Sequence, residues 1–164
     1  MADRVFTVSA GGITLANAAV TLVFINPPAA PSVGFRVLRC WIAQSANATS
    51  AQQRVQMVTQ VTSFPTLTSA TPRPNKLQNS AAVITGGTAG AAGTAGTNAS
   101  AEGAGSKTVL YESAFNVLNG FEWVATPKET VELPAGLASG FGLFLPVAAA
   151  TLTNWEFGVT YEEI

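Results

Sequence analysis

The feature that most constrains the fold of this chain is the strict alternation in its last stretch, NWEFGVTYEE (154–163). Trp155, Phe157, Val159 and Tyr161 are apolar, and the positions between them are polar or glycine. A period of two places every second side chain on the same face of a strand, whereas a helix would need apolar residues three and four apart. The C-terminal stretch therefore predicts a strand with one buried face.

The same periodicity recurs along the chain, and no segment shows a convincing amphipathic helix. Further strands are expected at 4–9, 19–26, 33–44, 53–62, 107–113, 120–125, 129–133 and 140–146. Short strands separated by Pro, Gly and Asn turns are typical of antiparallel sandwiches and jelly rolls. We expect one all-β domain over 1–164, an antiparallel β-sandwich that is jelly-roll-like.

The stretch 33–44 is apolar on both of its expected faces. Leu38, Cys40 and Ile42 alternate with a second apolar set, Phe35, Val37 and Trp41. Such a strand lies at the centre of a sheet or is covered by a neighbouring subunit.

Between residues 64 and 105 the alternation lapses, first in a Pro/Thr-rich part and then in a Gly/Ala-rich part. Glycines recur at 87, 90, 93 and 96, yet the run lacks the proline and the length of a collagen repeat. A phosphate-binding loop is excluded as well, because Lys107 and Thr108 follow the run but position 101 is alanine where that motif requires glycine. We expect 64–105 to be a long loop insertion, and expect the domain to fold without 86–105.

Composition excludes several functions. Only 10% of the residues are charged and the net charge is -1, so binding to nucleic acid or to an anionic membrane by electrostatics is not expected. The chain has no histidine, its only cysteine is Cys40 in the strand-like VLRCWIA, and its only aspartate is Asp3. We expect Cys40 to be a buried apolar residue, and expect no enzyme activity, no cofactor, no metal site and no small-molecule substrate. The start, MADRVFTVS, shows no secretory signal, and no apolar stretch is long enough for a membrane span.

The glutamates and the tryptophans suggest two other kinds of site. A carboxylate pair for glycoside hydrolysis could come from glutamates near the C-terminal strands, although solvated surface positions account for them better. These are Glu122, Glu129, Glu132, Glu162 and Glu163. Trp41, Trp123 and Trp155 could form a sugar-binding platform, but their positions in alternating strands favour packing in a core or a subunit interface.

Several segments resemble a known family. LNGFEWVATPKETVELPAG (118–136), GFGLFLPVAA (140–149) and TNWEFGVTYEE (153–163) resemble the C-terminal half of small virion proteins of tailed phages, the capsid decoration or cement proteins. RVFTVSAGGITL (4–15) and RVLRCWIAQSANATSAQQRVQMV (36–58) are compatible with the N-terminal half. The resemblance covers most of the chain except 64–105.

This resemblance implies a homotrimer that binds the outside of a phage head and stabilises contacts between major capsid proteins. The protein would be made in the host cytoplasm and reside on the outer capsid surface. The alternative is a tail-tip or fibre domain that binds a host glycan or receptor.

Extended arms can add strands to a neighbouring protein. The candidates here are an N-terminal arm (1–10) and the Pro-rich segment 64–76. Their expected partner contacts are Arg4, Val5, Phe6, Pro72, Arg73 and Pro74.

Overall fold

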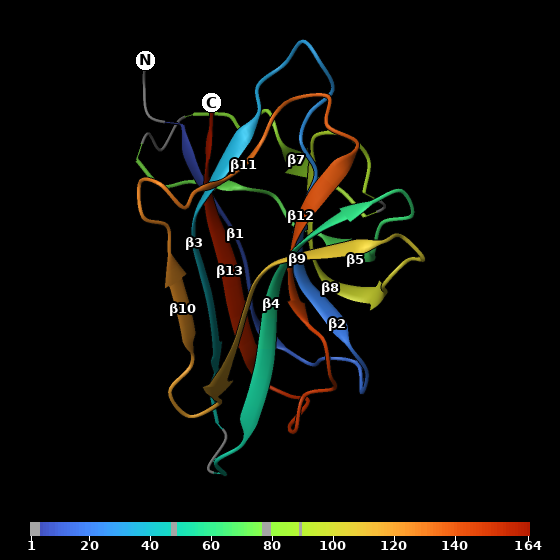
Figure 1. Cartoon of the computed structure of the whole chain (residues 1–164). Helices are drawn as coiled ribbons and strands as arrows, with labels where there is room; N and C mark the ends of the chain where they lie inside the picture. Colours follow the sequence, from blue (N-terminus) through green and yellow to red (C-terminus); the bar gives the residue numbers. More distant parts are fainter. Residues whose placement is uncertain (1–3, 47–48, 77–79, 89) are drawn as a thin grey trace.

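The computed structural model describes residues 4–46, 49–76, 80–88 and 90–164. Two sheets pack against each other with a shared core between them, and no helix occurs among the described residues (Figure 1). The predicted all-β sandwich is confirmed. Each strand expected from the alternating pattern is present.

Sheet A has six strands, five of them in the order β10-β3-β13-β1-β6. The sixth strand, β11, pairs with β3 on the same side as β10. These strands are β1 (Val5–Ile13), β3 (Phe35–Gln44), β6 (Arg73–Pro74), β10 (Phe121–Val124), β11 (Val131–Leu133) and β13 (Trp155–Glu163). Sheet B has seven strands in the order β5-β8-β2-β12-β4-β9, with β7 pairing on β8. They are β2 (Val20–Ile25), β4 (Gln52–Val61), β5 (Thr66–Ser69), β7 (Thr85–Gly86), β8 (Thr94–Ala101), β9 (Lys107–Asn116) and β12 (Ser139–Leu145).

The connectivity is that of a jelly roll. When the strands between β4 and β9 and the short β11 are set aside, eight strands remain. Numbered along the chain, they lie in the order 1-8-3-6 in sheet A and 2-7-4-5 in sheet B. Successive strands cross between the sheets except where β4 is followed by β9 in sheet B, which is the double Greek-key arrangement.

The stretch 64–105 is not the loop that the sequence predicts. It contains β5, β6, β7 and β8, and β8 lies inside sheet B, hydrogen-bonded to β2 on one side and to β5 on the other. Ala95, Gly96 and Thr97 of β8 are buried. Residues 77–79 and 89 of this stretch lie outside the described residues.

The regularly spaced glycines are part of this strand and of the turn before it. Gly90 and Gly93 adopt positive φ angles of 64° and 69°, which side chains strongly disfavour. A Cβ at Gly96 would lie 2.6 Å from the Cβ of Leu67 and 2.8 Å from the carbonyl oxygen of Gly87. Small residues here allow neighbouring segments to approach closely. The Gly/Ala-rich composition is therefore that of a packed strand, which cannot be recognised from apolar alternation. Deletion of 86–105 would remove β8, contrary to the expectation that the domain folds without it.

The predicted N-terminal arm is also not an arm where the structure describes it. Residues 1–3 lie outside the described part, and from Val5 onward the chain forms β1, paired along its length with β13. Phe6 and Val8 are fully buried. Alternating apolar residues at 5–8 bury one face in the core, which an arm reaching into solvent could not do.

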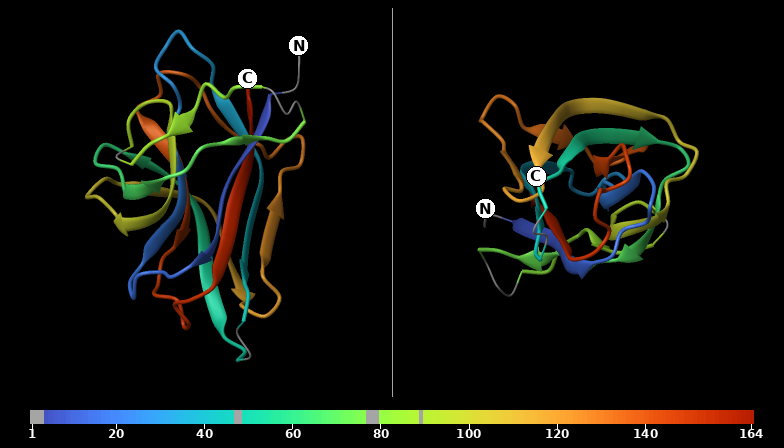
Figure 2. Two further views of the ribbon diagram at one scale, coloured as in Figure 1. Left: turned by 180° about the vertical axis from the view of Figure 1, so that it is seen from behind. Right: turned by 90° about the horizontal axis from the view of Figure 1, so that it is seen from below.

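The 64–105 insertion covers one side of the sandwich. It leaves sheet B after β5, crosses to sheet A where β6 pairs with β1, and returns to sheet B as β7 and β8 (Figure 2, left). Part of each edge is thereby covered by the same chain, at Phe6 and Thr7 of β1 and at residues 23–25 of β2. Covering an edge in this way removes a site for unwanted strand pairing.

The central position of β3 is confirmed, but its two faces differ from the expectation. Phe35, Val37, Cys40 and Ile42 are all buried, although 37 and 40 have opposite parity. The reason is a bulge: Thr160 pairs with Arg39 and Tyr161 with Val37, so Leu38 is an extra residue that shifts the phase.

Candidate functional site

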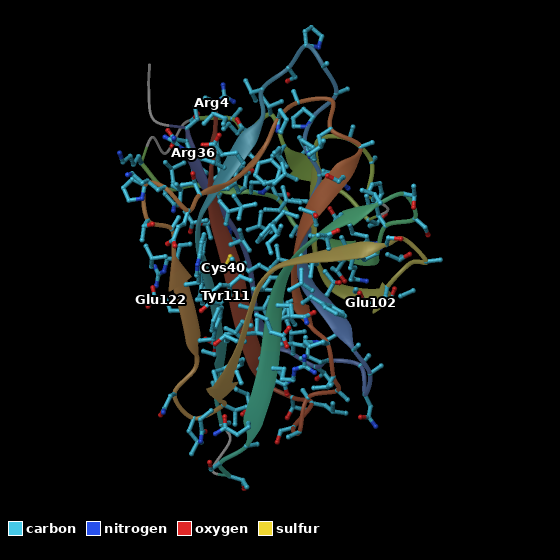
Figure 3. All side chains as sticks on the ribbon, viewed as in Figure 1. Arg4, Arg36, Cys40, Glu102, Tyr111 and Glu122 are labelled. Carbon is cyan, nitrogen blue, oxygen red and sulfur yellow. The ribbon has the colours of Figure 1, made fainter. Side chains whose placement is uncertain are left out.

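Most of the charged side chains are tied together in ion pairs. The pairs are Arg4–Glu163, Arg36–Glu162, Arg39–Glu122, Arg54–Glu112 and Lys107–Glu102. Arg4 and Arg36 lie at one end of the sandwich, and Glu122 lies on the outside of β10 (Figure 3). Hydrogen bonds from Arg54 and Gln56 lower the pKa of Glu112. Three of the five glutamates considered for catalysis, Glu122, Glu162 and Glu163, therefore have cationic partners.

Glu163 is the most buried of these carboxylates. Its Oε2 accepts hydrogen bonds from Nε and Nη2 of Arg4 (3.0 and 2.6 Å), and its Oε1 accepts from the backbone N–H groups of Val83 and Ile84 (2.8 and 2.9 Å). It thus joins the end of β13, the start of β1 and the insertion, which is a structural role.

Cys40 is fully buried, as predicted, and burial raises the pKa of its thiol. A buried thiol without an adjacent cation stays protonated at neutral pH and is a poor nucleophile. Among the described residues, no three His, Cys, Asp or Glu side chains lie close enough to hold a metal ion. No helix in the described part of the chain could cross a membrane.

The three tryptophans do not form a shared platform. Trp155 is fully buried and donates from Nε1 to the carbonyl oxygen of Thr151 (2.7 Å). Trp41 lies on the outer face of sheet A, 5.2 Å from the guanidinium of Arg39 and against Gly158. Trp123 lines a hollow described below.

The residues expected to contact a partner are brought together, but by pairing with each other. β6 lies beside β1, with Pro74 opposite Phe6 and Arg73 opposite Thr7. Arg4 is held by Glu163, and Val5 is half-buried. The N-terminal candidate arm and residues 73–74 of the Pro-rich one are therefore parts of sheet A, whereas β5 of the Pro-rich segment belongs to sheet B.

Their exposure decides which could still reach a partner. Phe6 and Pro72 are buried, Pro74 is half-buried and Arg73 is exposed. Contact of any of these residues with another protein stays a prediction.

A hollow of about 230 Å³, lined mainly by apolar and aromatic residues, opens at the opposite side of the sandwich, where β9 and β10 form the sheet edges. Its lining residues are Met57, Leu110, Tyr111, Trp123, Glu129 and Val131. Tyr111 points from β9 toward sheet A, where its ring lies 6.4 Å from that of Phe121 (Figure 3). Below it, Phe115 and Phe121 close the gap between the sheets with their rings 5.9 Å apart.

A bulge in β9 shapes this hollow. Met57 pairs with Tyr111 and Val58 with Val109, so Leu110 is an extra residue in the strand. The bulge allows the adjacent residues Leu110 and Tyr111 to line the same hollow, where a regular strand would place them on opposite faces. The sequence carried a signal of this site, because Val109, Leu110 and Tyr111 break the alternation with three apolar residues in a row.

Strand β9 itself is an open edge. It is ten residues long, it ends sheet B, and among the described residues it pairs only with β4. Val109, Leu110 and Tyr111 are 47%, 44% and 40% exposed. An open edge with exposed apolar side chains is a surface suited to binding another chain.

The fold and this surface define a class: an all-β sandwich with jelly-roll connectivity and an open apolar edge. Comparison with known proteins adds no narrower assignment, because the chain matches no family model, no curated protein and no solved structure.

Proposed function

We propose that this protein is a structural component of a phage virion, a decoration or cement protein. It binds the outside of the head as a homotrimer and stabilises contacts between major capsid proteins. The observation that carries this proposal is the long open edge of β9 with its three exposed apolar residues. The insertion pairs with part of the β1 edge and part of the β2 edge, whereas no described strand pairs with the outer side of β9, as expected of an edge that another protein covers.

Two further properties support a role in assembly. Several of the charged side chains form ion pairs with each other, and the net charge of the chain is only -1. Electrostatic repulsion between copies of the protein is therefore weak. Jelly rolls are also common among viral capsid proteins. The trimeric state and the head as the site of action rest on the resemblance of 118–136, 140–149 and 153–163 to decoration proteins.

Binding to heads tests this proposal. Purified protein is mixed with expanded, empty heads that lack it, the heads are pelleted, and their heat disruption is followed by electron microscopy. We expect saturable co-sedimentation and a higher disruption temperature. Protein that stays in the supernatant while the heads disrupt at an unchanged temperature would show that the proposal is wrong.

A pair of variants locates the contact. Val109→Asp places a charge on the β9 edge and should abolish coating, because an unpaired carboxylate would be buried. Val147→Asp is the matched control, since Val147 is 43% exposed but follows β12 and contacts Gln53 of β4, five residues along that strand from Val58, the partner of Val109. The control should coat heads as the wild type does.

A receptor-binding tail-tip or fibre domain is the second candidate, favoured by a hollow with several hydroxyl side chains on the side covered by the insertion. This hollow of about 410 Å³ has five hydroxyl side chains and one guanidinium in its lining: Ser9, Thr68, Ser69, Thr71, Thr97 and Arg73. Hydroxyl groups and an arginine can hydrogen-bond a glycan that carries an acidic group. This candidate predicts binding to host cells that Arg73→Ala weakens, with no effect of the protein on head stability.

A further inference from the structure

We propose that the hollow beside β9 receives a basic side chain, carried by an extended partner segment that adds a strand to β9. The inference rests on the proposed role in assembly, because it takes the ligand to be part of another protein. It extends that role by stating how the partner is recognised.

The walls of the hollow suit the stem of a long side chain. Met57, at the inner end, is a core residue with 1% of its surface exposed, whereas Leu110 and Tyr111 are partly exposed at the outer end. Lysine and arginine place their methylene groups against apolar surface and keep the charge near solvent. A hollow of about 230 Å³ is also smaller than the roughly 300–1,000 Å³ typical of small-molecule pockets.

The charge of the hollow fits a cation. Glu129 is the only charged residue in its lining, and within the described residues it takes part in no ion pair. Its Oε2 accepts a hydrogen bond from Oγ1 of Thr126 (2.8 Å), and its other oxygen remains able to accept from an incoming ammonium or guanidinium. The aromatic residues Tyr111 and Trp123 also line the hollow, and the face of an aromatic ring attracts cations.

The backbone beside the hollow fits an extended segment. No described strand pairs with the outer side of β9, so its outward N–H and C=O groups can pair with an added strand, whose side chains alternate between its two faces. A side chain directed toward sheet A from such a strand would enter between Tyr111 and Trp123. Main-chain hydrogen bonds would supply affinity, and the hollow would select the side chain.

A short peptide tests this without any capsid. The probe is acetylated and amidated threonine-valine-lysine-valine-threonine, compared with peptides in which norleucine or glutamate replaces the lysine. Two-dimensional NMR of the labelled full chain reports the indole N–H of each tryptophan and the β9 amides. Trp41, on the outer face of sheet A, and Trp155, in the core, serve as internal controls.

We expect the lysine peptide to shift the Trp123 indole and the β9 amides while the Trp41 and Trp155 indoles stay unchanged. The norleucine peptide should bind about three- to five-fold more weakly, the size of effect expected for a partly exposed charge pair, and the glutamate peptide more weakly still. Absence of a Trp123 shift with the lysine peptide at about 10 mM, enough to detect millimolar binding, would overturn the inference.

Glu129→Gln supplies the variant and Glu132→Gln the control. Val131 of β11 lines the hollow, and Glu132 is the next residue of the same strand, in register with Arg36 of β3. Because successive side chains of a strand point to opposite faces, Glu132 points away from the hollow. The Glu129 variant should bind the lysine and norleucine peptides equally, and the Glu132 variant should keep the three- to five-fold preference. A preference for lysine that survives Glu129→Gln would contradict the proposal.

The peptide result is independent of the head-binding result. Failure of the wild type to coat heads, with lysine-selective peptide binding intact, refutes the decoration role but not the hollow as a site for a basic side chain. Coating of heads without lysine selectivity refutes the hollow alone.

Discussion

Replacing Glu163 with alanine is expected to destabilise the fold by about 3 kcal/mol. The Glu163 side chain is fully buried, and its carboxylate accepts four hydrogen bonds, two from Arg4 and two from the backbone of 83–84. Removing it breaks the connection between β1, β13 and the insertion at a single point.

The magnitude follows from the two sides of the carboxylate. Ile84 is fully buried, so its N–H loses its acceptor away from water, at a cost of about 1–3 kcal/mol. The Arg4 side chain is 36% exposed and can regain water, so loss of the ion pair adds only about 1 kcal/mol. For a chain of this length, about 3 kcal/mol corresponds to a fall in Tm of roughly 6–12 °C.

The neighbouring residue provides the control. Glu162 pairs with Arg36, but these side chains are 18% and 39% exposed, so Glu162→Ala should cost under about 1 kcal/mol. Urea unfolding and thermal melts of both variants measure the difference. Equal losses for the two variants would refute the claim that the Glu163 site holds the insertion onto the sandwich.

Three further predictions concern buried positions. Gly96→Ala should lower the free energy of unfolding by about 1–3 kcal/mol in urea, because the added Cβ would overlap Leu67. Gly11→Ala is the control, since its Cβ would lie 3.6 Å from the nearest atom, Cγ of Glu156, and it should change stability by less than about 0.5 kcal/mol. Equal losses in the two variants would refute the packing of β8. Cys40 should not react with a thiol reagent at pH 8 until urea unfolds the chain, because burial raises its pKa; equal labelling rates before and after unfolding would contradict this. Tyr161→Phe should leave stability unchanged or raise it by up to about 1 kcal/mol, because the buried hydroxyl has no hydrogen-bond partner in the described structure. Burial, and then the charge of Glu163, raise the pKa of the Tyr161 hydroxyl in the folded state. The free energy of unfolding is therefore unaffected by this group below about pH 10 and falls as the pH rises further, because the unfolded chain then loses the proton more readily. In urea titrations at high pH, the phenylalanine variant should lack this fall.

The sandwich could be predicted from sequence where one face of a strand is buried. Trp155, Phe157, Val159 and Tyr161 alternate because β13 lies in a sheet with the core on one side, and all four are fully buried. Which residues of β3 face the core could not be predicted beyond Leu38. The bulge there depends on the pairing of β3 with β13 and not on the residues of β3 alone.

Strand β8 was missed for a different reason. Its residues are small because the neighbouring Leu67 and Gly87 leave no space at Gly96, and this close approach removes the apolar alternation by which strands are recognised. The two predicted arms are wrong because the pairing of Phe6 with Pro74 joins residues far apart in the chain, and no local sequence pattern indicates such a pairing.

The hollow could be predicted only in part. The apolar run at 109–111 marked an unusual strand, whereas the convergence of Trp123 and Glu129 on it depends on how β10 and the following turn face β9.

The most direct test of the proposed function is a cryo-electron microscopy reconstruction of expanded heads incubated with the purified protein. The proposal predicts trimeric density on the outer surface at three-fold positions, with the β9 side of each sandwich against a neighbouring protein. A bare shell at saturating protein concentration, or density confined to the tail, would contradict it.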